Sequence, residues 1–151
     1  MRKTLSVLMS LCLLCVPAAG CAEKARPSEP AANAAIPDFV DLTNLSSTMV
    51  YAEVYNIMTN PAAYVGKTIK AGGAYQATNY YPDGYYHFVL IADAAACCQQ
   101  GFEFVWAGKH KYPDDYPQDG TQIEVTGVFG RYIEQGNTFY HLTVDEIAVK
   151  G

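Results

Sequence analysis

Residues 67–78 read KTIKAGGAYQAT, and this stretch decides the fold class that the chain predicts. Ile69, Ala71 and Tyr75 occupy alternate positions, a period of two that is typical of a β-strand. Gly72-Gly73 interrupts the strand, and consecutive glycines weaken a strand unless the chain must bend there. We therefore expect one long strand that coils or bulges at the glycine pair.

Four further strand-like segments follow this strand, and turn-forming residues separate them. Pro82 and Gly84 favour a hairpin turn, and Gln135-Gly136-Asn137 is typical of a second one. Such regularly spaced short strands are typical of a small closed sheet. The chain therefore predicts an all-β, five-stranded barrel whose remaining strands are 85–92 (YYHFVLIA), 101–106 (GFEFVW), 121–132 (TQIEVTGVFGRY) and 138–149 (TFYHLTVDEIAV).

One N-terminal helix is expected before the first barrel strand. Ser47 or Thr48 can cap it, and Asn60-Pro61 ends it. Apolar residues recur between these limits at helical spacing. They are Val50, Val54, Ile57 and Met58.

The strand pattern over residues 47–151 resembles the oligonucleotide/oligosaccharide-binding (OB) fold, through the runs 60–73, 121–127 and 142–147. In addition, Ala92-Asp93, Cys97-Cys98 and Gly101 are similar to a segment in the soluble part of an uncharacterised bacterial family described as permease subunits, and in related small lipoproteins. The resemblance implies an OB-fold-like domain in the cell envelope. The resemblance implies no particular activity for this chain.

Residues 1–20 have the pattern of a bacterial export signal. Arg2 and Lys3 precede an apolar run at residues 5–16, which is too short to cross a bilayer. Ala18-Ala19-Gly20-Cys21 then resembles a lipobox, so we expect lipid on Cys21 and an anchor at the outer face of the membrane. Ordinary secretion, with cleavage at a small-residue site, is the alternative.

Residues 21–46 contain three of the eight prolines and lack apolar periodicity, so they predict a flexible tether ahead of a domain at 47–151. Phe39, Val40 and Leu42 could dock on that domain. The boundary is therefore soft.

The composition favours a packed, acidic domain. Half of the residues are hydrophobic, 17% are charged, and the net charge is −5. Loss of residues 1–20 removes two basic and no acidic residues, which leaves −7. Phosphate backbones are repelled by such a surface, so nucleic acid is not an expected partner.

Cys97-Cys98 is the main candidate for chemistry. Two neighbouring thiols can hold zinc or copper(I), with His87 on the preceding strand as a third ligand. Two other interpretations stay open. The cysteines could be small buried hydrophobes, or they could form a reducible vicinal disulfide.

Aromatic residues suggest a second candidate site. Tyr85, Tyr86 and Trp106, with Tyr112 and Tyr116 nearby, could form a recognition surface for a saccharide or a protein partner on the second and third barrel strands. The alternative is that these rings only cover the core.

No motif indicates an enzyme: the chain has no GxSxG and no phosphate-binding glycine loop. His110 and His141 are expected to be ordinary polar residues. Asp114, Asp115 and Asp119 fail the calcium-loop spacing, and we expect them in a solvated loop.

Overall fold

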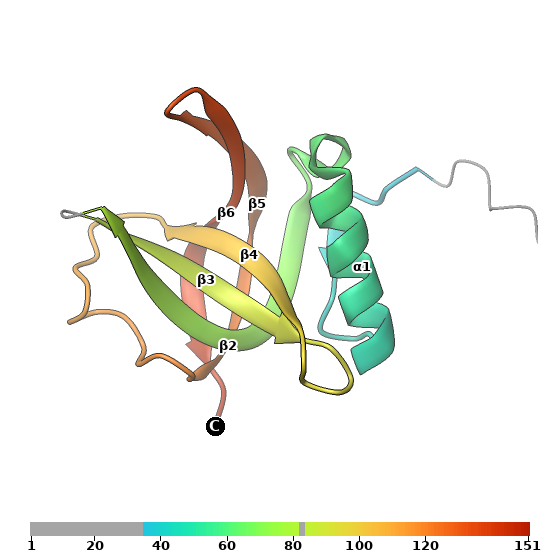
Figure 1. The fold of residues 1–151 in the computed structure, drawn as a ribbon, viewed down its shortest axis with the longest axis horizontal. Coiled ribbons are helices and arrows are strands. Elements are labelled where there is room, and N and C mark those ends of the chain that lie inside the picture. The colour runs from blue at the N-terminus through green and yellow to red at the C-terminus, as the bar shows by residue number, and fades with distance from the viewer. Residues whose placement is uncertain (1–34, 82–83) are drawn as a thin grey trace, which may run out of the picture. The chain divides into compact units, whose positions relative to one another are not determined.

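The computed structural model describes residues 35–81 and 84–151. The predicted export signal, Cys21 and the first part of the predicted tether lie outside these ranges. No helix within them is long and apolar enough to cross a membrane. The elements are β1 (Phe39–Asp41), α1 (Ser47–Thr59), a 3-10 helix (Pro61–Tyr64), β2 (Thr68–Tyr81), β3 (Gly84–Ala92), β4 (Gln99–Trp106), β5 (Gln122–Glu134) and β6 (Asn137–Val149) (Figure 1).

Strands β2 to β6 form a closed ring of pairings. β2 pairs antiparallel with β3 through residues 74–81 and with β5 through residues 68–74. β3 pairs antiparallel with β4, β4 pairs parallel with β6, and β6 returns antiparallel to β5. The resulting order, β2-β3-β4-β6-β5 and back to β2, is that of an OB-fold barrel. The predicted all-β fold, a five-stranded OB-fold-like barrel with one N-terminal helix, is confirmed.

The glycine pair lies where β2 changes partners. Gly72 and Gly73 pair with β5, and Ala74 pairs with both β5 and β3. A Cβ on Gly73 would collide with the carbonyl oxygen of Leu90 on β3. The bend is therefore at the predicted place. The register shifts lie elsewhere, between Asn79 and Tyr81 and between Val125 and Gly127.

A sixth strand, β1, which the sequence did not indicate, joins the sheet beside the first residues of β2. β1 pairs parallel with Thr68–Lys70, and Val40 and Leu42 are buried in the core. The compact unit accordingly begins at Ala35. The boundary expected between residues 46 and 47 therefore moves toward the N-terminus, because the stretch after residue 38 docks on the barrel.

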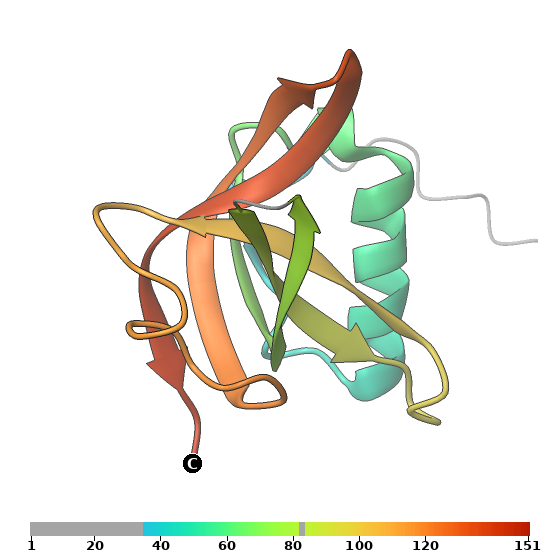
Figure 2. The ribbon, with the colours of Figure 1, turned by 60° about the vertical axis from the view of Figure 1, so that its left-hand side comes forward.

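Helix α1 packs against the barrel, where it contacts β3 and β4 (Figure 2). Its N-cap is Ser46, whose hydroxyl accepts a hydrogen bond from the Met49 amide at 3.4 Å. The expected cap at Ser47 or Thr48 is wrong, because both residues already lie inside the helix. Val54 and Ile57 are fully buried, whereas Met58 stays 45% exposed.

We predict that Gly73→Ala destabilises the domain by about 1–3 kcal/mol, the usual range for overpacking a fitted interior. The added methyl group would meet backbone of β3, which cannot rotate away. Gly84→Ala is the matched control, because a Cβ there meets nothing within 4 Å. Urea unfolding of both variants provides the measurement. Equal stability for the two would contradict the close β2–β3 approach.

Candidate functional site

A groove runs between the β3–β4 strands and the β5–β6 hairpin. It consists of two hollows of about 470 and 500 Å³, which share Tyr86, Glu103 and Tyr132 in their walls. Tyr85 and Tyr86 both line the groove, as the sequence predicted for an aromatic surface. His87 and Tyr116 line the first hollow, and Glu134 lines the second.

Two hydrogen bonds tie the β5–β6 hairpin across this groove. The Tyr86 hydroxyl donates to the Glu134 carboxylate at 2.7 Å, and the Tyr132 hydroxyl donates to Glu103 at 2.8 Å. Burial raises the pKa of Glu103 above its usual value, although the bond from Tyr132 opposes this shift. The groove therefore combines aromatic rings with two fixed carboxyl groups.

The sequence did not indicate Glu103, Tyr132 or Glu134 as site residues. Glu103 is 29 residues from its partner Tyr132, and Glu134 is 48 residues from its partner Tyr86. One local signal was available for Glu103. It stands between Phe102 and Phe104, which are both buried, so its side chain must point to the other face of β4.

His87 lies at the aromatic end of the groove. Its Nδ1 is 2.7 Å from the Tyr75 hydroxyl, and its ring stacks on Tyr116 with centroids 4.0 Å apart. Only 9% of His87 is exposed, and burial lowers its pKa. His87 is therefore a neutral, packed residue at ordinary pH.

Trp106 packs edge-on against the groove-lining Tyr116, with ring centroids 5.4 Å apart. Its indole N–H donates to the Asp145 carbonyl at 3.1 Å, and its ring stacks on His110 at a centroid distance of 3.7 Å. It does not line either hollow. Tyr112 also lines neither hollow, but its ring contacts Tyr85 in a tilted arrangement with centroids 4.2 Å apart.

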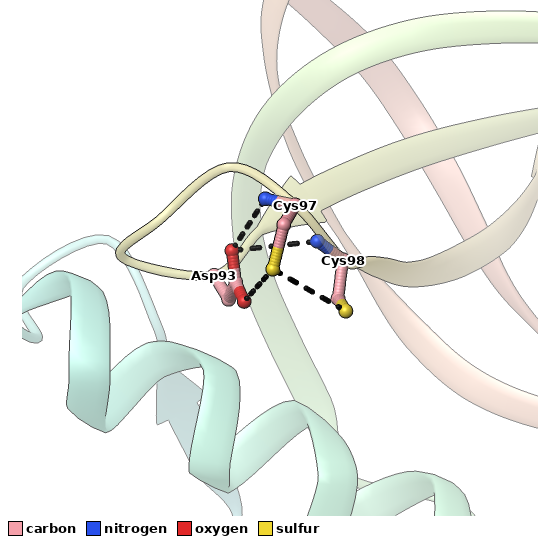
Figure 3. Close-up of side chains that lie close together, drawn as sticks. All are labelled: Asp93, Cys97 and Cys98. Atoms are coloured by element: carbon pink, nitrogen blue, oxygen red, sulfur yellow. Dashed lines mark hydrogen bonds between the residues drawn. The ribbon is translucent and has the colours of Figure 1, made fainter.

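The β3–β4 connection brings Cys97 and Cys98 together with Asp93 (Figure 3). The Cys97 thiol donates to Asp93 Oδ2 at 3.2 Å, and the two sulfurs are 3.6 Å apart. Both cysteines are exposed, so the interpretation as buried hydrophobes is wrong. Within the described ranges, this is the one group of three or more potential ligand residues with donor atoms within 4.8 Å of one another.

Asp93 organises the loop that carries both cysteines. Its Oδ1 accepts hydrogen bonds from the Cys97 amide at 2.9 Å and the Cys98 amide at 3.4 Å. The backbone adds Asp93 N–H to the Cys98 carbonyl and Ala96 N–H to the Asp93 carbonyl. Ala96 adopts the left-handed φ of 53° that this tight connection needs. The turn therefore gathers three donor side chains within six residues.

The residues grouped by the structure differ from the ligand set predicted from the sequence, because Asp93 replaces His87. His87 pairs with Phe104 near the start of β3, whereas Asp93 follows the far end of that strand. The structure does not bring His87 close to the cysteines. Asp93 is instead the third residue of the group. Of the three ligand residues predicted from the sequence, the structure groups Cys97 and Cys98 but leaves His87 outside the group.

The aspartates of the loop between β4 and β5 stabilise that loop. Asp114 pairs with Lys111 at 3.0 Å, and Asp115 accepts from the Lys111 amide. Asp119 accepts from the Ala77 amide of β2 at 2.9 Å. Within the described residues, none of these three aspartates belongs to a group of three or more potential ligand side chains.

Comparison with known proteins adds little to this geometry. No protein-family model matches the chain, and no curated protein matches it. Among solved structures, the chain is similar to the N-terminal domain of the PriB protein from Thermoanaerobacter tencongensis. The identity is 9% and the TM-score is 0.35, over 56% of this chain and 96% of that one. The fold assignment therefore rests on the strand order, and the resemblance to permease subunits stays a prediction.

We predict that Asp93→Asn makes Cys97 more reactive. The hydrogen bond to Asp93, helped by Cys98 and by the negative charge, raises the pKa of the Cys97 thiol to about 11. Neutralising the carboxylate lowers that pKa, and the thiolate fraction at pH 8 rises about tenfold for each unit. Iodoacetamide labelling should therefore accelerate by about tenfold or more in Asp93→Asn.

Labelling should be followed by mass spectrometry in a Cys98→Ser background, so that only one thiol contributes to the peptide. Asp114→Asn is the control, since it removes an exposed carboxylate from a different loop. Equal labelling rates with and without the Asp93 charge would contradict this account of the thiol.

Proposed function

We propose that this chain is a lipid-anchored, non-enzymatic binding protein of the cell envelope, whose OB-fold-like domain holds a saccharide in the groove. The observation that carries the proposal is the composition of the groove. Tyr86, Glu103 and Tyr132 line both hollows of the groove, Tyr85 lines the first, and Glu134 lines the second. OB-fold barrels use this face of their second and third strands for ligands.

Saccharides fit this lining better than other ligand classes. The ring of Tyr85, which Tyr112 supports in a tilted contact, offers an aromatic surface against which the apolar face of a sugar ring can pack. Carboxylate oxygens at Glu103 and Glu134 accept hydrogen bonds from several hydroxyl groups at once. A neutral polyol supplies both kinds of contact.

Nucleic acid is a poor fit to the same space. Two carboxyl groups, Glu103 and Glu134, line the second hollow, and the chain carries a net charge of −5. Single-strand binding needs a basic groove beside its stacking rings. The expectation from composition thus agrees with the local charge of the groove.

The envelope location is supported by the leader pattern. Arg2 and Lys3, the short apolar run and Ala18-Ala19-Gly20-Cys21 together indicate export and lipid attachment at Cys21. A diacyl anchor would hold an otherwise hydrophilic domain at the outer face of the membrane. In this proposal, residues 22–34 form part of the tether between the lipid anchor and the compact unit that starts at Ala35.

We predict that Cys21→Ala abolishes lipid attachment. The variant should remain unprocessed or appear in the soluble fraction, because no acyl chain can be added to alanine. Metabolic labelling with a clickable fatty acid and fractionation of the cells provide the measurement, with Cys15→Ala as the control inside the leader. Labelled, membrane-bound Cys21→Ala protein would show that this cysteine is not the anchor.

We predict that envelope-derived oligosaccharides bind the groove, and that Tyr85→Ala weakens the affinity about two- to tenfold, the value of one aromatic contact. Glu103→Gln should weaken it by about tenfold or more, because a charged hydrogen-bond acceptor is lost. Isothermal calorimetry on hits from a glycan array measures both. Tyr55→Ala is the control, as this residue is 57% exposed on α1 and does not line the groove.

Two results would contradict the saccharide assignment. One is an array without binding, together with capture of a specific envelope protein by the same tyrosines, which would make the groove a protein interface. The other is tighter binding of single-stranded oligonucleotides than of any glycan.

A further inference from the structure

The thiol cluster is separate from the groove and independent of the proposed function. It follows the last residue of β3, whereas Tyr85 and His87 lie near the first. Both cysteines are exposed at the surface of the β3–β4 connection. Any chemistry at Asp93, Cys97 and Cys98 is therefore open to solvent and does not require the saccharide site.

The spacing of the donor atoms matches one kind of metal coordination closely. In a tetrahedral zinc site, a Zn–S bond of about 2.3 Å places two sulfurs about 3.8 Å apart, and a carboxylate oxygen about 3.6 Å from each sulfur. The sulfurs of Cys97 and Cys98 are 3.6 Å apart, and Cys97 Sγ is 3.2 Å from Asp93 Oδ2. The third pair, Cys98 Sγ and a carboxylate oxygen of Asp93, lies within 4.8 Å, so a movement of up to about 1.2 Å in that pair would complete the arrangement.

Neighbouring residues in a regular strand direct their side chains to opposite faces, which would separate the two sulfurs. The turn overcomes this problem. Ala96 takes a left-handed conformation, and Asp93 Oδ1 holds the amides of Cys97 and Cys98. Figure 3 shows both sulfurs directed to the same side of the loop as the Asp93 carboxylate. The donors are therefore gathered before any ion arrives.

We propose that Asp93, Cys97 and Cys98 bind one Zn²⁺ ion through two thiolates and one carboxylate oxygen, with the fourth coordination position open to solvent. Three protein ligands and an open position distinguish such a site from closed, four-ligand structural zinc sites. The ion stays accessible to water or to a donor atom from another molecule.

Zinc fits the donor set better than copper(I). Two-coordinate copper(I) needs its sulfurs on opposite sides of the ion, roughly 4.6 Å apart if the bonds are as long as those of zinc. The observed separation of 3.6 Å is much shorter. A hard carboxylate oxygen beside two soft thiolates also suits zinc, which accepts both ligand types.

Binding is a ligand exchange without electron transfer. In the metal-free loop, the protonated Cys97 thiol donates a hydrogen bond to the Asp93 carboxylate. Zn²⁺ takes the place of that proton, and both thiols release their protons to solvent as two Zn–S bonds and one Zn–O bond form. Two protons therefore leave for each ion bound, and the loaded site carries one negative charge.

The test uses the full chain in detergent micelles with Cys12, Cys15 and Cys21 changed to serine, so that Cys97 and Cys98 are its only thiols. The reduced protein is titrated with Co²⁺, which reports thiolate bonds by a charge-transfer band and tetrahedral geometry by its visible bands. Zn²⁺ then displaces the cobalt. We expect one ion per chain and two protons released on zinc binding.

Three variants assign the ligands. Cys97→Ser and Cys98→Ser should each weaken zinc binding by at least about tenfold and reduce the charge-transfer band. Asp93→Asn keeps an oxygen that can accept from the loop amides but removes the carboxylate, so it should weaken binding about tenfold or more while the band remains. Asp114→Asn should bind as the parent does, and circular dichroism confirms that each variant is folded.

Several outcomes would overturn the proposal. They are unchanged zinc affinity in Asp93→Asn, binding without a thiolate band, uptake of copper(I) with no uptake of zinc, and isolation of the two cysteines as a disulfide that fails to bind zinc after reduction. The last outcome would point to the redox interpretation of the pair. Loss of saccharide binding would leave this result unaffected, so the two proposals fail separately.

Discussion

The fold depends on the pairing of β2 with two other barrel strands, β5 and β3. Its first half pairs with β5 and its second half with β3, and the change of partner at Ala74 converts a row of strands into a ring. Gly73 permits this because its missing Cβ lets the β3 backbone approach. Since the ring closes, none of the five barrel strands is left as an open edge along its whole length.

Closure also separates the two candidate sites. The β3–β4 hairpin carries aromatic and acidic side chains near the start of β3, where the β5–β6 hairpin crosses to bond Tyr86 and Glu103. Its tight connection presents Asp93 and the cysteines at the other end. The two proposed sites therefore lie toward opposite ends of β3, and neither needs residues of the other.

Much of the barrel was predictable because a period of two survives in each strand, so all five strands were located to within a few residues. β1 was missed because three residues are too few to show a period, although Val40 and Leu42 are buried. The sites were harder to predict. His87 is close to the cysteines in sequence but lies near the other end of β3, whereas Asp93 reaches Cys97 only through the left-handed Ala96. Glu134 meets Tyr86 only after the hairpin crosses the groove.

The closed ring is the claim on which both sites depend, and amide hydrogen exchange tests it most directly. The Phe129 amide of β5 donates across to the Lys67 carbonyl, immediately before β2, at 2.8 Å. In a closed barrel, this amide should exchange as slowly as the β5 amides that bond to β6, because both sides of β5 are paired. Rapid exchange at Phe129 beside protected β6-facing amides would show an open sheet and contradict the account.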